Sequence, residues 1–292
     1  KLTDHADFHQ VAKTAGLYAD ANIYVNHSEL NGFLKSLAGT NVKNAPFFDH
    51  PMAGWSALDL TLKSDQMMGN GFVHVSDSTP QYFNALVGQS PQEVNVTRIL
   101  PTNTAYLLHF GLSHFPTFYK RYQFLLTQQN EYFSYDQSRT EFNQRIDANS
   151  EDLSLSWIGS EMAVFITEPN YGSYEQLSYL AFSSADAEKG IELLIQLSEA
   201  LGKPPETSEL NGNTIYSLRI DNVYGRLLGS PFEGFDDVMV TQIEDYIVLA
   251  QSKSAMRNLI NYVATKNTLY RDDNFESFMG NLGKRSNLLL YS

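Results

Sequence analysis

The chain has 292 residues, of which 42% are hydrophobic and 18% charged. These values are typical of a globular chain rather than a disordered one, and the length allows one large domain or two ordinary ones. The net charge of −13 excludes nucleic acid and anionic membrane surfaces as main partners, because both attract cationic proteins. No apolar run approaches the ~20 residues of a transmembrane helix. The chain has no Cys, which excludes disulfides and Cys-ligated zinc and favours an extracytoplasmic setting.

The first half predicts a helix followed by alternating strands and helices. Apolar residues at helical spacing predict the first helix over 4–15. The elements that follow are a strand at 22–25, a helix at 28–38, strands at 55–62 and 66–75, a helix at 79–87 and a strand at 104–110. This βαββαβ order is typical of a ferredoxin-like unit. Gly69 and Gly71 lie inside one of these strands, which indicates a bulge or a close backbone contact rather than a dinucleotide loop.

Residues 115–146 are rich in aromatic side chains set among polar ones. We expect one helix to about Gln128 and a second from about Asp136 to Ile146, bridging the two halves. Exposed Tyr side chains among Asn and Gln suit stacking on sugars or peptides. Tyr119, Tyr132 and Tyr135 are therefore the candidate binding residues, although helically spaced aromatics more often belong to a core.

The second half predicts a similar alternation of elements. Expected are a helix at 152–158, strands at 161–167 and 176–182, a helix to Ala200, a strand at 214–220, a hairpin over 237–252 and a helix to Val263. Ser28, Ser78, Ser113 and Ser252 or Ser254 each lie where a strand gives way to a helix. We predict that their hydroxyls accept hydrogen bonds from the first turns of these helices.

Two stretches near the ends of the chain share a pattern. Leu2, Phe8 and Gly16 recur with the same spacing as Leu269, Phe275 and Gly283, and with a small gap Asn22 recurs as Asn287. We expect 268–292 to be the start of a further repeat, with both Phe side chains facing inward from helices. The two glycines should follow the helix ends in a left-handed conformation.

The fold class predicted is α+β, with two similar halves. Each half would have an antiparallel or mixed sheet with helices on one face. Residues 1–147 would form the first half, including the bridging helices, and residues 148–292 the second.

Several strings resemble a domain-of-unknown-function family of bacterial, envelope-associated, anchored repeat proteins. They are 99–104 (Ile-Leu-Pro-Thr-Asn-Thr), 157–161 (Trp-Ile-Gly-Ser-Glu), 245–252, 268–275 and 286–288. These strings are structural rather than catalytic. The resemblance implies a repeated α+β fold, a location in the periplasm or at the cell surface, and anchoring through a segment that precedes Lys1, as in a lipoprotein. It implies no reaction.

Candidate chemistry is sparse. His5 and His9 have the spacing of a helical metal clamp but no third ligand, so an exposed helix explains them better. Glu233, Asp236 and Asp237, and likewise Asp272, Asp273 and Glu276, form acidic clusters that could hold Ca²⁺ or act in hydrolysis. Carboxylates at helix starts are also favoured by the helix dipole, which is the reading we prefer. We expect no metal and no cofactor.

Three functions remain open. The first is a non-catalytic scaffold or binding module whose partner is a protein or glycan of the cell envelope. The second is a glycan- or peptide-binding module that uses exposed aromatics. The third is a hydrolase with an unrecognised carboxylate pair.

Overall fold

A computed structural model describes residues 2, 5–16, 18–37, 52–64, 67–76, 80–169 and 177–292. The chain forms two compact units, one of residues 1–87 and 119–132 and the other of residues 88–118 and 133–292. The predicted division into residues 1–147 and 148–292 differs from the division between these two units. Residues 88–118 belong to the second unit because they contain β5 (Thr104–Gly111), which pairs with β6 (Glu161–Thr167).

The first unit contains a three-stranded antiparallel sheet with the order β1-β2-β3. Its strands are β1 (Ala21–Asn26), β2 (Trp55–Leu62) and β3 (Met67–His74), and its helices are α1 (Ala6–Ala12), α2 (His27–Leu37) and η3 (Tyr82–Leu86). The helix α3 (Phe115–Gln128) enters this unit at Tyr119.

The core of this sheet is small and aromatic. Val11, Trp55 and Ala57 are buried, and Phe8 packs edge-on against Trp55 with ring centroids 5.2 Å apart. Phe8 also meets Tyr24 edge-on. The stripe of apolar residues predicted on the first helix therefore does face the sheet.

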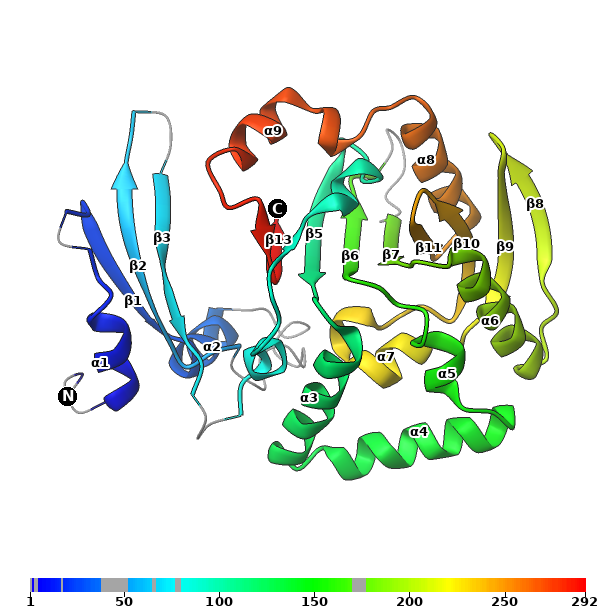
Figure 1. Ribbon diagram of the computed structural model, residues 1–292, viewed down its shortest axis with the longest axis horizontal. Helices are drawn as coiled ribbons and strands as arrows, with labels where there is room; N and C mark the ends of the chain where they lie inside the picture. The colour runs from blue at the N-terminus through cyan, green and yellow to red at the C-terminus, as the bar shows by residue number, and fades with distance from the viewer. Residues whose placement is uncertain are drawn as a thin grey trace. The chain divides into compact units, whose positions relative to one another are not determined.

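The second unit is built on an eight-stranded antiparallel sheet with the order β13-β5-β6-β7-β11-β10-β9-β8 (Figure 1). The strands not yet named are β7 (Leu177–Ser183), β8 (Glu206–Leu210), β9 (Asn213–Arg219), β10 (Asp237–Ile243), β11 (Tyr246–Ala250) and β13 (Leu288–Tyr291). A separate short pair joins β4 (Gln92–Glu93) to β12 (Arg285–Ser286). The predicted α+β class with antiparallel sheets is confirmed.

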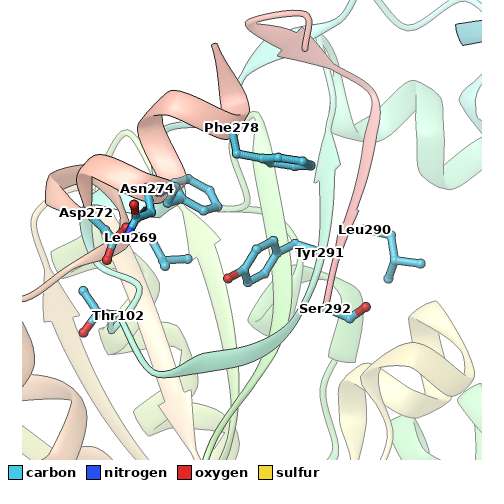
Figure 2. A pocket seen from close by; sticks show the side chains of 9 residues that line it. Thr102, Leu269, Asp272, Asn274, Phe278, Leu290, Tyr291 and Ser292 are labelled. Carbon is cyan, nitrogen blue, oxygen red and sulfur yellow. Dashed lines mark hydrogen bonds between the residues drawn. The ribbon is translucent and has the colours of Figure 1, made fainter. Parts of the chain in front are cut away.

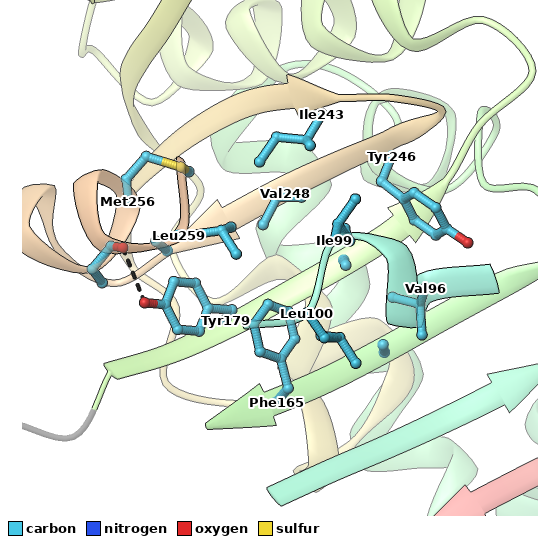
Figure 3. Packing of buried hydrophobic residues seen from close by; sticks show 14 of the residues in the cluster. Val96, Ile99, Leu100, Phe165, Tyr179, Ile243, Tyr246, Val248, Met256 and Leu259 are labelled. Atoms are coloured by element: carbon cyan, nitrogen blue, oxygen red, sulfur yellow. Dashed lines mark hydrogen bonds between the residues drawn. The ribbon is translucent and has the colours of Figure 1, made fainter. Parts of the chain in front are cut away.

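One face of the large sheet carries the main hydrophobic cluster (Figure 3). The elements that cover it are η4 (Asn95–Arg98), α8 (Lys253–Ala264), η6 (Leu269–Arg271) and α9 (Asp273–Met279). Phe165 stacks on Tyr179 with ring centroids 4.6 Å apart, and the Tyr179 hydroxyl donates to the carbonyl oxygen of Ala255 at 3.0 Å. That bond ties the sheet to the start of α8.

The other face is also covered by helices. They are α5 (Ser150–Ser154), α6 (Ala187–Ala200), α7 (Val223–Leu228) and η5 (Ser230–Phe232), and α4 (Tyr132–Ile146) precedes them. Phe182 of β7 packs against Trp157, Tyr224 and Phe232. At Gly190, α6 lies so close to Ile247 that any Cβ would overlap it.

Two features of the predicted architecture are corrected by these observations. Helices cover both faces of the large sheet rather than one, because β6, β7 and β11 are buried almost throughout instead of at alternate positions. The two units are also unequal, because among the described residues their main sheets have three and eight strands. The predicted βαββαβ set does not share one sheet, since its last strand is β5.

The predicted serine caps have mixed outcomes. Ser252 caps α8, accepting a hydrogen bond from Ala255 N at 3.1 Å. Ser28 lies in the first turn of α2, but Asn26 Oδ1 accepts from its N–H. Ser113 precedes α3 by two residues, yet Nδ1 of His114 accepts from the helix. Ser78 lies outside the described residues.

The two stretches with a shared pattern both form a helix followed by an edge strand. Phe275 packs edge-on against Tyr291 with centroids 5.3 Å apart, as Phe8 does against Tyr24 at 5.2 Å. Duplication itself stays a prediction. The expected left-handed glycines are wrong, since neither Gly16 nor Gly283 has a positive φ. Gly16 instead donates its N–H to Asp59 Oδ2 at 2.8 Å, where a side chain would collide.

Candidate functional site

An open groove lies between α9 and β13 in the second unit. Asp272 starts α9 by accepting a hydrogen bond from Phe275 N at 2.8 Å. The helix ends at Met279, and the chain then returns through β12 to pair β13 with β5. Helix and edge strand thus face each other because one short stretch of sequence folds back on itself.

The groove has a volume of about 570 Å³ and opens to solvent (Figure 2). Its lining is mostly apolar and comes from Thr102, Leu269, Asp272, Asn274, Phe275, Phe278, Leu290, Tyr291 and Ser292. This volume lies within the range of roughly 300–1,000 Å³ that is usual for small-molecule sites.

The aromatic residues of the groove divide into buried and exposed members. Phe275 is buried and holds Tyr291 edge-on, so these two form its floor. Phe278 is 55% exposed and Leu290 is 61% exposed. Tyr291 and Leu290 leave β13 in opposite directions (Figure 2), so the groove continues round the edge of the sheet. Phe278 and Leu290 thus form an exposed apolar rim beside the hollow.

Among the described residues that line the groove, Asp272 is the one with a charged side chain. One of its oxygens is engaged as the helix cap, and the other can accept a hydrogen bond from a ligand. A single carboxylate does not supply the acid–base pair of a glycoside hydrolase. The arrangement is suited to binding an apolar group that has a cationic or hydrogen-bonding neighbour.

The groups that most resemble a catalytic set are buried elsewhere. His109 Nε2 lies 3.0 Å from Glu161 Oε1, and the Tyr246 hydroxyl donates to Glu161 Oε2. All three residues are at most 3% exposed. Burial and the Glu161 carboxylate raise the pKa of Tyr246 well above its usual range. With no access for a substrate, this set serves the packing of the sheet.

The predicted tyrosines lie on helices and do not line the groove. Tyr119 of α3 is 9% exposed, while Tyr132 and Tyr135 of α4 are half-buried. Each already interacts with neighbouring groups. Their proposed role in binding stays a prediction.

One residue of each predicted acidic cluster, and both predicted histidines, make local contacts. Asp237 pairs with Lys203 at 2.9 Å, and Asp272 is a helix cap. His5 lies against the Trp55 ring, and the ring centroid of His9 is 6.1 Å from that of Phe8. Within the described ranges, no three His, Asp or Glu residues gather as metal ligands would.

Sequence reasoning missed Phe278 and Tyr291 as groove residues. Phe275 and Phe278 are three residues apart on one helix, and the uncharged run 288–291 stands at a sheet edge. This spacing and this uncharged run are visible in the sequence. Only the pairing of β13 with β5 shows that the two stretches line one groove.

Comparisons of the chain with protein-family models, with curated proteins and with solved structures found no match. Among the described residues, no helix is both long and apolar enough to cross a membrane.

Proposed function

We propose that this protein is a non-catalytic binding module that acts outside the cytoplasm. The groove between α9 and β13 is its ligand site. The observation that carries the proposal is the combination of an open, aromatic-lined hollow with exposed apolar side chains, Phe278 and Leu290, at its rim. Such side chains cost solubility unless a partner covers them.

The proposed location and partner rest on sequence features. A chain of this length without Cys suits an oxidising compartment, and the resemblance described above points to the bacterial envelope. We infer that the ligand belongs to a protein or a glycan of that envelope. The groove favours binding over hydrolysis because its lining holds one carboxylate.

The test is a binding screen of the whole chain against two probes, a display library of random ten-residue peptides and an array of oligosaccharides. Ligands are then measured on a Phe278→Ser variant. We expect about tenfold weaker binding, the effect of losing one aromatic contact at a binding site. Phe124→Ser is the matched control, because Phe124 is 62% exposed on α3 and is not one of the residues that line the groove. Ligands that bind both variants equally, or an empty screen, would refute the groove as the ligand site.

A further inference from the structure

The strand β13 forms one edge of the eight-stranded sheet. It pairs with β5 on one side, and among the described residues no strand pairs with its other side. Gly111 N donates to Asn287 O at 3.0 Å, so Asn287 is bonded to the β5 side of the pair. In an antiparallel pair, every second residue turns its backbone groups toward the partner. Leu289 and Tyr291 therefore face β5, while Leu288 and Leu290 turn their N–H and C=O groups outward.

This edge lacks the features that normally block strand addition. Edge strands are usually protected by charged side chains, proline or bulges. The opposite edge, β8, carries Glu206 and Glu209. The residues of β13 are Leu-Leu-Leu-Tyr, with no charge and no proline. One edge strand of the sheet, β8, thus carries charged side chains that oppose pairing with another chain, and the other, β13, carries none.

The outward edge lies directly beside the groove. Leu290 and Tyr291 belong to both the edge strand and the groove lining. Side chains of an added strand would alternate between the two faces of the sheet. Those on the α9 side would meet Phe278 and Tyr291, and those on the other side would meet Leu290. Asp272, the one charged lining residue, would favour a cationic side chain on the same strand.

We propose that the ligand is an extended cationic peptide that pairs with the outer edge of β13. Leu288 and Leu290 supply the backbone hydrogen bonds, and alternate apolar side chains of the peptide fill the groove. A Lys or Arg of the peptide pairs with Asp272. This inference rests on the proposed function and names the class of ligand for the same site.

The first experiment uses peptides from the random display library described above, with N-methyl groups placed on alternate amides. Methylation of the amides that face β13 removes donors without changing side chains. We expect binding to fall about tenfold or more for one alternate set, and by less than about threefold for the other set. Since the protein is unchanged, folding defects cannot produce this pattern. Equal effects of the two sets would overturn strand pairing.

The second experiment changes the protein edge. Leu290→Pro removes an outward N–H, and proline is tolerated on an edge strand whose N–H faces away from the sheet. We expect binding to weaken about tenfold, while Leu290→Thr, which keeps the N–H, loses less. Asp272→Asn keeps the helix cap and should reduce the salt dependence of binding. A Leu290→Pro variant that binds as well as Leu290→Thr would contradict the proposal.

The outcomes separate the two proposals. Oligosaccharides that bind in a Phe278-dependent manner, with no such peptide, would leave the groove as a ligand site and overturn the peptide inference. Peptides whose binding is weakened by Phe278→Ser but not by Leu290→Pro would also leave the groove as a ligand site and overturn strand pairing. Absence of any Phe278-dependent ligand would overturn both proposals.

Discussion

A carboxylate that is only 3% exposed must take its hydrogen bonds from the protein, and Glu161 does so from three sides. Asn95 N donates to Oε1 at 2.8 Å, His109 lies against the same oxygen, and Tyr246 donates to Oε2. These contacts join η4, β5 and β11 to the first residue of β6. Removing one donor destabilises the fold by more than the net free energy of one hydrogen bond. The reason is that the buried carboxylate remains and has lost a hydrogen-bond partner.

Tyr246→Phe is expected to lower the free energy of unfolding by about 1–3 kcal/mol at neutral pH, since Glu161 Oε2 loses its donor. Burial and Glu161 raise the pKa of Tyr246. Its contribution to stability is therefore complete below about pH 10, the unfolded pKa, and is lost as pH rises toward the folded pKa. Denaturant unfolding at about pH 8 and about pH 11 should show a smaller alkaline loss in the variant than in the wild type.

Tyr224→Phe is the control for this prediction. Tyr224 is fully buried and burial raises its pKa, but its hydroxyl donates to the neutral carbonyl of Ser154 at 3.3 Å. Its loss near pH 8 should be smaller than that of Tyr246→Phe. If the two variants lose equal free energy of unfolding, the hydrogen bond to the Glu161 carboxylate contributes no more than the bond to a neutral carbonyl.

At the scale of elements, the hairpin of β2 and β3 depends on a close backbone approach. The register places Gly71 opposite Leu58, and a Cβ at Gly71 would overlap the carbonyl oxygen of Ala57. The expectation of a close backbone contact at this glycine is confirmed. Gly32 in α2 has no neighbouring atom within 4 Å of such a Cβ.

Gly71→Ala should therefore destabilise the first unit by about 1–3 kcal/mol, the usual cost of overpacking. Gly32→Ala should instead be neutral or stabilise by up to about 1 kcal/mol, because Ala is the better helix former. Thermal unfolding in a Trp157→Phe background, followed by the fluorescence of Trp55 in β2, measures both. A Gly71→Ala variant as stable as the wild type would show that the two strands do not pack as described.

Elements were largely predictable because their signals are local. The strands at 55–62 and 161–167 match their predicted ranges, and β10 and β11 form the predicted hairpin within 237–252, since polar turn residues bound each apolar run. The strand β8 was missed because Glu-Thr-Ser-Glu-Leu has little β character. Burial on both faces was missed because it depends on which helices return over the sheet. The groove could not be predicted for the same reason, as β13 and β5 are distant in sequence.

At the scale of the molecule, the two units differ greatly in the size of their cores. Among the described residues, the sheet cluster of the first unit has three buried members, whereas the main cluster of the second has Val96, Leu107, Phe165 and many others. Buried apolar area is the main source of stability, so the first unit should be the weaker. The two tryptophans of the chain, Trp55 and Trp157, lie one in each unit.

Single-tryptophan variants test this difference. With Trp157→Phe the remaining Trp55 reports the first unit, and with Trp55→Phe the remaining Trp157 reports the second. The Trp55 signal should change at a lower denaturant concentration than the Trp157 signal. Hydrogen exchange of the wild-type protein, with slower exchange in β6 and β11 than in β2, is the independent check. Coincident transitions and uniform protection would mean that the chain unfolds as a single cooperative unit.

The position of β13 beside β5 has a consequence for biosynthesis. About 180 residues of chain separate the two strands. At roughly 5–20 residues per second, a ribosome needs on the order of 10 to 40 s to make that length. During that time the edge of β5, with its apolar run Tyr-Leu-Leu-His-Phe, can pair with any other strand in reach. Nascent copies on one messenger are the nearest source of such strands, so this protein should depend on a chaperone, or on slow initiation of translation, to avoid joining its neighbours before it is complete.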